Sequence, residues 1–309
     1  MRRSGLAVAV VLVGLTLGQG CRTGGTRPSG PEAAESAPEC APGLQLTVDL
    51  AAWEAELVAA AESPEAVSTV LARLGLRGIP GEDLCLSSPD EERPAQRLSL
   101  GGVSVTPAAL TGPEPTDRIV EALLNGCPGG DPMEARTFQR IVVLRPLGPG
   151  RWCWLGDLSS DQYVTESPNL PDPVAASTEP ETLPGRTYAL VNLTDPRRQT
   201  LRVRDRSGGG VSIERGALYA TSYWDVQDSA LAEIFRVATY TAYYESPIPP
   251  LREEVATVEP TGAFPKDLVV TREVLCHPEE AAEGEPPEPC TPSRAVETYT
   301  FRDGRYEAR

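Results

Sequence analysis

The 309-residue chain has very little histidine and lysine, two residue types that often take part in catalysis. It contains one histidine, His277, and one lysine, Lys266, among 28 basic residues. A Ser-His-Asp or Cys-His site would have to use His277. That histidine stands beside Cys276 and is followed by Pro278 and an acidic run over residues 279–288. We therefore interpret His277 as a solvated loop residue, and the sequence predicts no catalytic residue.

The N-terminal apolar stretch is too short to cross a bilayer as a helix, which takes about 20 residues. It spans the twelve residues 6–17, is interrupted only by Gly14 and Thr16, and follows Arg2 and Arg3. This order of charge and apolar residues is typical of a secretory signal peptide. We expect residues 1–20 to be an export signal.

Gly18-Gln19-Gly20-Cys21 ends this stretch, and the whole segment resembles the type II signal peptide of bacterial lipoproteins. Gly20 and Cys21 match the family's lipobox. Leu17 stands four residues before the cysteine, where the family has leucine at three, and Gln19 replaces a small residue. The resemblance implies cleavage before Cys21 and lipidation of its thiol, with two or more acyl chains holding the protein stably at a membrane.

The resemblance places the chain in the cell envelope, at the outer membrane if the organism has one. The alternative is an ordinary secreted protein in which Cys21 forms a disulfide. Because Arg2 and Arg3 are adjacent, export by the twin-arginine route is a further alternative, although the surrounding residues fit that signal poorly.

None of the seven cysteines has Cys-x-x-Cys spacing, which disfavours zinc, haem attachment and a thioredoxin-like site. The sequence therefore predicts no metal and no cofactor. If Cys21 is lipidated, six cysteines remain for three disulfides, which persist in an oxidising compartment. Fifteen connectivities are open. Local proximity favours Cys276–Cys290 and Cys127–Cys153, which leaves Cys40–Cys85.

Acidic residues outnumber basic ones by 44 to 28, and removal of residues 1–20 gives 26 − 44 = −18. Such a charge repels nucleic acid, so we expect no nucleic-acid partner. It also repels anionic lipid headgroups, so attachment to the membrane would rest on the lipid and not on a basic patch.

Composition divides the mature chain into two domains. Residues 21–43, rich in Gly, Pro, Ser, Thr and Ala, read as a lipid-anchored flexible tether. Residues 165–186 are rich in proline and read as a linker. The predicted domains are therefore residues 44–164 and 187–309.

The first domain begins with two helix signals. Asp49 is a helix N-cap, and Trp53 and Leu57 share one face of the helix that follows. Ser63-Pro64-Glu65 is a second start, with Gly75 as the stop. These signals predict a helical hairpin whose apolar stripe is core.

After Leu98 the pattern is typical of strands. Short apolar runs flank Gly148-Pro149-Gly150, and further runs precede Asp303-Gly304, both of which are hairpin turn signals. The predicted fold class is α+β: a helical hairpin with a small antiparallel sheet, followed by a mainly antiparallel β domain. Residues 142–154 and 296–308 resemble each other. Either both segments use the same type of hairpin turn independently, or they derive from an internal duplication.

Two segments, residues 225–234 and 259–268, resemble the calcium loops of FG-GAP-type secreted repeats in length and at both ends. Gln227, Ser229 and Thr261 stand where the family has carboxylates. Calcium needs six to eight oxygen ligands. The resemblance therefore implies strand-entry turns that have lost a metal.

An aromatic cluster is the remaining candidate for ligand contact. Its members are Trp224, Tyr240, Tyr243 and Tyr244. The three tyrosines are in the second half of a predicted strand, residues 234–244, and Trp224 precedes that strand. Exposed rings on a sheet stack on sugars or on a partner protein. Packing in the core is the simpler interpretation.

The sequence thus favours a lipid-anchored cell-envelope protein with a non-catalytic binding or scaffolding role. Its expected partners are the membrane, through the anchor, and an envelope protein or a polysaccharide. A carboxylate-dependent envelope hydrolase and a carbohydrate-binding module are the alternatives.

Overall fold

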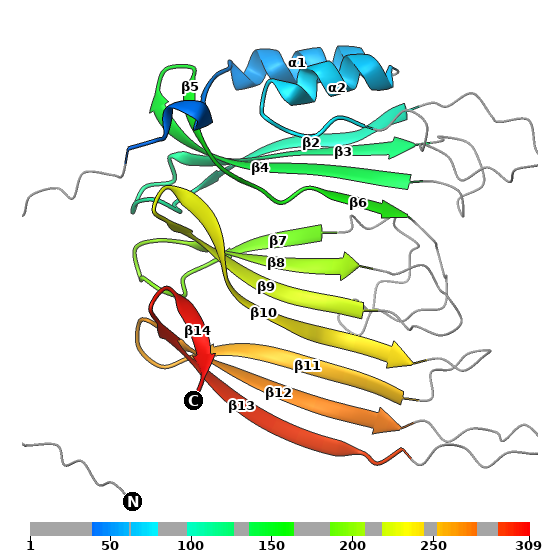
Figure 1. Ribbon diagram of the computed structural model, residues 1–309, viewed down its shortest axis with the longest axis vertical. Coiled ribbons are helices and arrows are strands. Elements are labelled where there is room, and N and C mark those ends of the chain that lie inside the picture. Colours follow the sequence, from blue (N-terminus) through cyan, green and yellow to red (C-terminus); the bar gives the residue numbers. More distant parts are fainter. Residues whose placement is uncertain are drawn as a thin grey trace, which may run out of the picture. The chain divides into compact units, whose positions relative to one another are not determined.

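The computed structural model describes residues 39–61, 63–79, 98–126, 136–163, 186–207, 218–243, 252–276 and 290–309. All of them belong to one compact unit, Pro38–Arg309. In this part of the chain, fourteen strands and two α-helices form two antiparallel sheets (Figure 1). The fold is therefore mainly antiparallel β.

Both predicted helix starts are confirmed. After a short 3-10 turn (η1, Pro42–Leu44), helix α1 (Leu50–Ala60) begins at Asp49, whose carboxylate accepts hydrogen bonds from the amides of Ala51 and Ala52. Helix α2 (Pro64–Ala72) begins at Ser63, whose hydroxyl accepts from the amide of Ala66. Neither helix of the described part is long and apolar enough to cross a membrane.

The first sheet has the strand order β1-β5-β4-β3-β2, with β6 paired to β4. Most residues along β3 are buried, and they belong to two different cores, with Val120 and Leu124 in one and Ile119 in the other, so both faces of this strand are covered. The strand bounds are β1 (Gln45–Thr47), β2 (Leu98–Ala108), β3 (Asp117–Gly126), β4 (Arg136–Gly148), β5 (Arg151–Asp157) and β6 (Ser160–Tyr163).

The second sheet is an eight-stranded meander in which each strand pairs with the next. Residues 240–243 of β10 pair with residues 252–255 of β11, and beyond this short ladder the two strands separate. The bounds are β7 (Arg186–Val191), β8 (Thr200–Ser207), β9 (Leu218–Gln227), β10 (Ala230–Tyr243), β11 (Arg252–Thr261), β12 (Asp267–Cys276), β13 (Ser293–Arg302) and β14 (Arg305–Ala308).

Three four-stranded meanders therefore follow one another along the chain. We call β2–β5 the first meander, β7–β10 the second and β11–β14 the third. Each ends in a tight hairpin that needs a left-handed backbone, at Gly150, at Asp228 and Ser229, and at Asp303 and Gly304. The hairpins at β4–β5 and β13–β14 are the two segments that resemble each other in the sequence.

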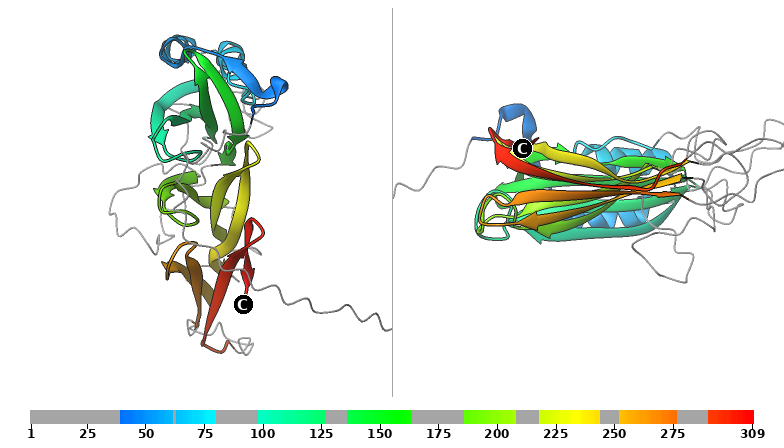
Figure 2. Two further views of the ribbon diagram at one scale, coloured as in Figure 1. Left: turned by 90° about the vertical axis from the view of Figure 1, so that its left-hand side faces the viewer. Right: turned by 90° about the horizontal axis from the view of Figure 1, so that it is seen from below.

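Three apolar cores hold these layers together. The helices pack on one face of the first meander through Trp53, Leu57 and Leu71 (Figures 1 and 2). The opposite face of that meander packs against the second meander, where Val143 and Leu155 meet Leu201. A third core joins the second and third meanders and contains residues such as Tyr223, Phe235, Leu268, Val270 and Tyr306.

The predicted α+β class is wrong. The helices of the described part are two short segments that cover one face of a sheet, and strands make up most of the rest. From Leu98 onward, every element of the described part is a strand. The two sheets lie on either side of the predicted linker, residues 165–186, and residues 164–185 are outside the described part. Residues of both predicted domains share the second core.

Candidate functional site

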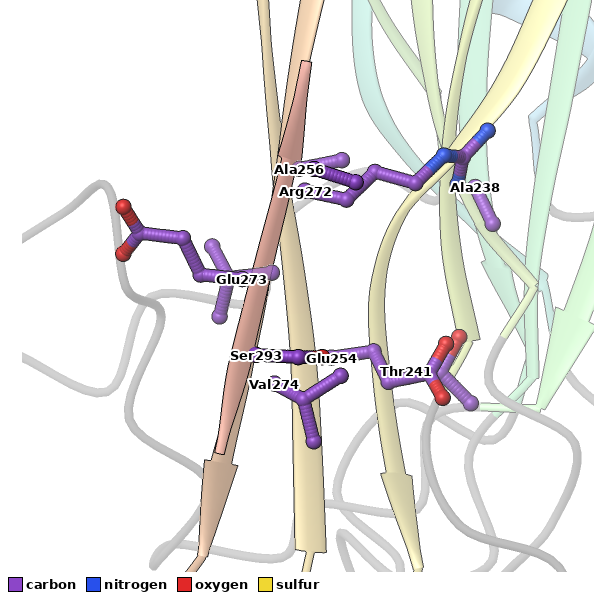
Figure 3. A pocket seen from close by; sticks show the side chains of 10 residues that line it. Ala238, Thr241, Glu254, Ala256, Arg272, Glu273, Val274 and Ser293 are labelled. Atoms are coloured by element: carbon purple, nitrogen blue, oxygen red, sulfur yellow. The ribbon is translucent and has the colours of Figure 1, made fainter. Parts of the chain in front are cut away.

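A small pocket of mixed apolar and charged lining lies where β10 and β11 separate (Figure 3). Its volume is about 180 Å³. A bulge between Ala238 and Tyr240 interrupts the pairing of β10 with β9 and places Ala238 and Thr241 in the wall. The rest of the lining comes from β11, β12 and β13: Glu254, Val255, Ala256, Arg272, Glu273, Val274, Ser293 and Ala295.

Arg272 is the main charged group that reaches across this pocket, toward Ala238 (Figure 3). Its Nε lies 3.5 Å from a carboxylate oxygen of Glu297, and the hydroxyl of Tyr299 donates to the same oxygen at 2.8 Å. Burial raises the pKa of Tyr299, and the hydrogen bond to Glu297 raises it further. Tyr299 is therefore a donor at neutral pH, and the charge of Arg272 is balanced within the site.

The two carboxylates of the pocket cannot act as a facing pair. Glu254 is opposite Val274 in the β11–β12 ladder, whereas Glu273 is opposite Val255, so the two side chains leave opposite faces of the sheet. Figure 3 shows them extending in different directions. Glycosidic chemistry needs two carboxylates that flank one bond. A volume of about 180 Å³ is also below the roughly 300–1,000 Å³ of small-molecule sites.

A wider groove of about 470 Å³ lies between the start of α1 and strands β2, β3 and β5. Its polar groups hold local structure. Trp152 donates from Nε1 to the carbonyl of Val48 at 3.0 Å. Arg118 donates to the carbonyls of Pro115, Thr116 and Asp117 at 2.8–3.0 Å. The groove thus offers an apolar floor with charged groups that are engaged at its rim.

The aromatic residues singled out from the sequence do not form an exposed row in the described part. Tyr240 is only 3% exposed and stacks on Tyr219, with ring centroids 5.3 Å apart. Trp224 donates from Nε1 to the hydroxyl of Ser222 at 2.8 Å and packs against the second core. The side chain of Tyr243 and all of Tyr244 lie outside the described residues.

The two segments that resemble calcium loops are turns of adjacent meanders, and the structure brings them together. Residues 225–234 include the β9–β10 turn, and residues 259–268 include the β11–β12 connection. Asp225 accepts a hydrogen bond from Thr194 at 2.8 Å, and Tyr306 donates to the carbonyl of Lys266 at 2.7 Å. Burial raises the pKa of Tyr306, with smaller contributions from Asp267, Tyr223 and Asp225. In the segments that the structure describes, no three Asp, Glu, His or Cys side chains gather as metal ligands.

The cysteine pairing differs from the prediction. The predicted Cys276–Cys290 disulfide is present, with the Cα atoms 5.8 Å apart. Cys40 is bonded to Cys153, so Cys127–Cys153 and Cys40–Cys85 are wrong. The ladder of β1 with β5 places Gln45 opposite Cys153 and brings Cys40, five residues earlier, to the same strand.

Two disulfides are consistent with an exported protein. Four residues of the predicted chemistry lie outside the described residues: Cys21, Cys85, Cys127 and His277.

Buried charges were missed from the sequence. Arg140 is fully buried and donates to the carbonyls of Arg77 and Gly78 while pairing with Asp161. Asp205 is paired with Arg186 at 3.0 Å and lies 3.7 Å from Arg236. The available signal for Arg140 is its position, since it alternates with the apolar residues of a buried strand.

No family model, curated protein or solved structure matches the chain.

Proposed function

We propose that this protein is an exported, lipid-anchored cell-envelope protein with a non-catalytic binding or scaffolding role. The observation that carries the proposal is the Cys40–Cys153 disulfide. Cys40 is near the end of the predicted tether, residues 21–43, and Cys153 is a fully buried residue of β5. The bond therefore fastens the end of the tether covalently to the core.

Such a bond suits a chain that is held at its N-terminus. The two cysteines are 113 residues apart, and closure of a loop of about 100 residues stabilises a fold by roughly 4.7 kcal/mol in the chain-entropy model. A pull on a lipid at Cys21 would reach the first meander through this covalent link, without first unpairing the short strand β1. In a protein anchored at Cys21, this disulfide would transmit force from the anchor directly to the buried strand β5.

The arrangement of charged groups supports a binding or scaffolding role. Two buried charges, Arg140 and Asp205, connect separate segments of the fold. The pocket at β10–β13 is small and its arginine is paired. These features favour a rigid body that presents surfaces to an envelope partner.

Fractionation of cells that produce the full chain tests the proposal. We expect the wild-type protein in the membrane fraction and Cys21→Ser in the soluble exported fraction, because the variant lacks the acceptor thiol. His277→Ala is the matched control and should fractionate like wild type. A Cys21→Ser protein that stays with the membrane would overturn the proposal.

A further inference from the structure

We infer that one end of the strands lies against the lipid headgroups of the membrane that holds the anchor. We call it the tether end, and it consists of the six connections that lie at one end of the strands: β2–β3, β4–β5, β7–β8, β9–β10, β11–β12 and β13–β14, which are residues 109–116, 149–150, 192–199, 228–229, 262–266 and 303–304. The inference rests on the proposed function, since it concerns how an anchored molecule faces its membrane.

Two backbone hydrogen bonds join connections of the tether end from one meander to the next. The amide of Gln199 donates to the carbonyl of Ala109 at 2.7 Å, which joins the first and second meanders. The amide of Lys266 donates to the carbonyl of Leu193 at 3.0 Å, which joins the second and third. In Figure 1 the turns of all three meanders lie on the left-hand side.

The tether leaves the fold at this same end. The carbonyl of Glu39 accepts a hydrogen bond from the hydroxyl of Ser229 in the β9–β10 turn at 3.5 Å. The next residue, Cys40, is bonded to Cys153 in the β4–β5 hairpin. Residues 22–38 link this point to Cys21, and if they form the tether that the sequence predicts, a linker of that length spans roughly 20–25 Å on average. Lipidation of Cys21 would therefore hold this end close to the bilayer.

Charge is divided unequally along the sequence. The six connections of the tether end hold 3 basic and 4 acidic residues, a net charge of −1. The other segments between elements after α2, residues 73–97, 127–135, 164–185, 208–217, 244–251 and 277–292, hold 5 basic and 18 acidic residues, a net charge of −13. The tether end is therefore the least acidic set of connections that the chain can turn toward an anionic leaflet.

The tether end also carries groups that suit a headgroup layer. Phe264 is a large apolar side chain that is 39% exposed, and the ammonium of Lys266 lies 4.7 Å from the centre of its ring. Arg197, in the neighbouring connection, is 79% exposed. An aromatic ring flanked by long cationic side chains places its apolar part at the boundary and its charges among phosphates.

The single lysine makes this orientation measurable. The full lipidated protein is added to preformed vesicles of phosphatidylethanolamine and phosphatidylglycerol and recovered by flotation. A membrane-impermeant amine-reactive ester then modifies Lys266, and peptide mass spectrometry gives the rate at that residue. The same measurement in detergent micelles supplies the reference.

The matched control moves the only lysine to the other end without changing the net charge, by combining Lys266→Arg with Arg294→Lys. Arg294 is at the start of β13, directly after the acidic segment, and its side chain is 69% exposed. We expect several-fold slower labelling of Lys266 on vesicles than in micelles, and equal rates for the lysine at position 294.

Floating protein with equal Lys266 labelling in vesicles and micelles overturns the orientation and leaves the anchor intact. Stronger protection at position 294 than at 266 overturns it as well. Protein that does not float overturns the proposed function, and the orientation falls with it.

Discussion

Asp117 shows how a single buried carboxylate organises a connection. It accepts hydrogen bonds from the amides of Leu110 and Thr111, at 2.9 and 2.8 Å, and from the hydroxyl of Thr111. Burial raises its pKa above 3.8, although these hydrogen bonds and the charge of Arg145 act in the opposite direction. The folded state therefore holds the proton of Asp117 more tightly than the unfolded chain does.

The raised pKa gives a pH dependence with a defined sign. The contribution of Asp117 to stability is full below the unfolded pKa and is lost as pH rises through the folded pKa. We expect the free energy of unfolding of wild type, minus that of Asp117→Asn, to fall as pH rises from strongly acidic to neutral. Urea unfolding of both proteins across this range measures the difference. A difference that stays constant or grows with pH would contradict the assignment.

The Cys40–Cys153 disulfide predicts a large loss on removal. Replacement of both cysteines by serine should lower the free energy of unfolding by about 2–5 kcal/mol, because the unfolded chain regains the freedom of a long loop. The matched control replaces Cys276 and Cys290, whose separation is 14 residues, and should cost less. Denaturant unfolding under oxidising conditions compares the two, and a larger loss in the control would refute the argument.

At the scale of elements, the packing of the first meander on the second depends on Gly156 in β5. A Cβ atom at this residue would lie 2.7 Å from the Cβ of Leu231 in β10, which is closer than such atoms approach in proteins. Gly156→Ala should therefore lower the free energy of unfolding by about 1–3 kcal/mol, as overpacked cores do.

Gly102→Ala is the control for this substitution, because an added Cβ at Gly102 meets nothing within 4 Å. Thermal or urea unfolding of both variants measures the effect. Equal stability of the two variants would show that β5 and β10 do not approach each other as closely as the structure has them.

Elements with local signals could be predicted from the sequence, and those defined by distant contacts could not. Asp49 and Ser63 are N-caps that act on the amides two or three residues away, so both helix starts were predictable. The turn at Gly150 was predictable for the same reason. The disulfide of Cys40 with Cys153 depends on the pairing of β1 with β5, which no local pattern encodes.

The candidate site was harder to predict from the sequence than the helices and turns were. The pocket at β10–β13 lies where β10 and β11 separate, next to a bulge of β10 against β9 between Ala238 and Tyr240. Neither feature was predicted from the sequence. Tyr240 and Trp224 were candidates for ligand contact, yet both pack within the fold. This agrees with the simpler interpretation of the sequence, in which these rings belong to the core. Aromatic residues give the same pattern in a core as on a binding face.

For the whole molecule, the fold class was misjudged because the number of layers cannot be read from periodicity. The three meanders cover one another in sequence, and the helices close the open face of the first. The pattern of each strand reports a covered face but not which layer covers it. The two helix signals were therefore taken as evidence for an α+β class, whereas the helices cover one face of a mainly antiparallel β fold.

The cysteine count yields a further prediction at this scale. Two disulfides are formed among the described residues, and Cys21, Cys85 and Cys127 lie outside them. If Cys21 carries lipid, Cys85 and Cys127 remain as the third pair, in place of the pairings first predicted. Non-reducing peptide mapping should recover a Cys85–Cys127 cross-link, and a link from either residue to Cys21 would refute it.

The central claim is that the mature chain begins at a lipidated Cys21, and mass spectrometry of its N-terminal peptide tests this most directly. We predict a peptide that starts at Cys21 and carries a diacylglyceryl group on the thiol. An unmodified Cys21, or a mature N-terminus at another residue with Cys21 in a disulfide, would contradict the account.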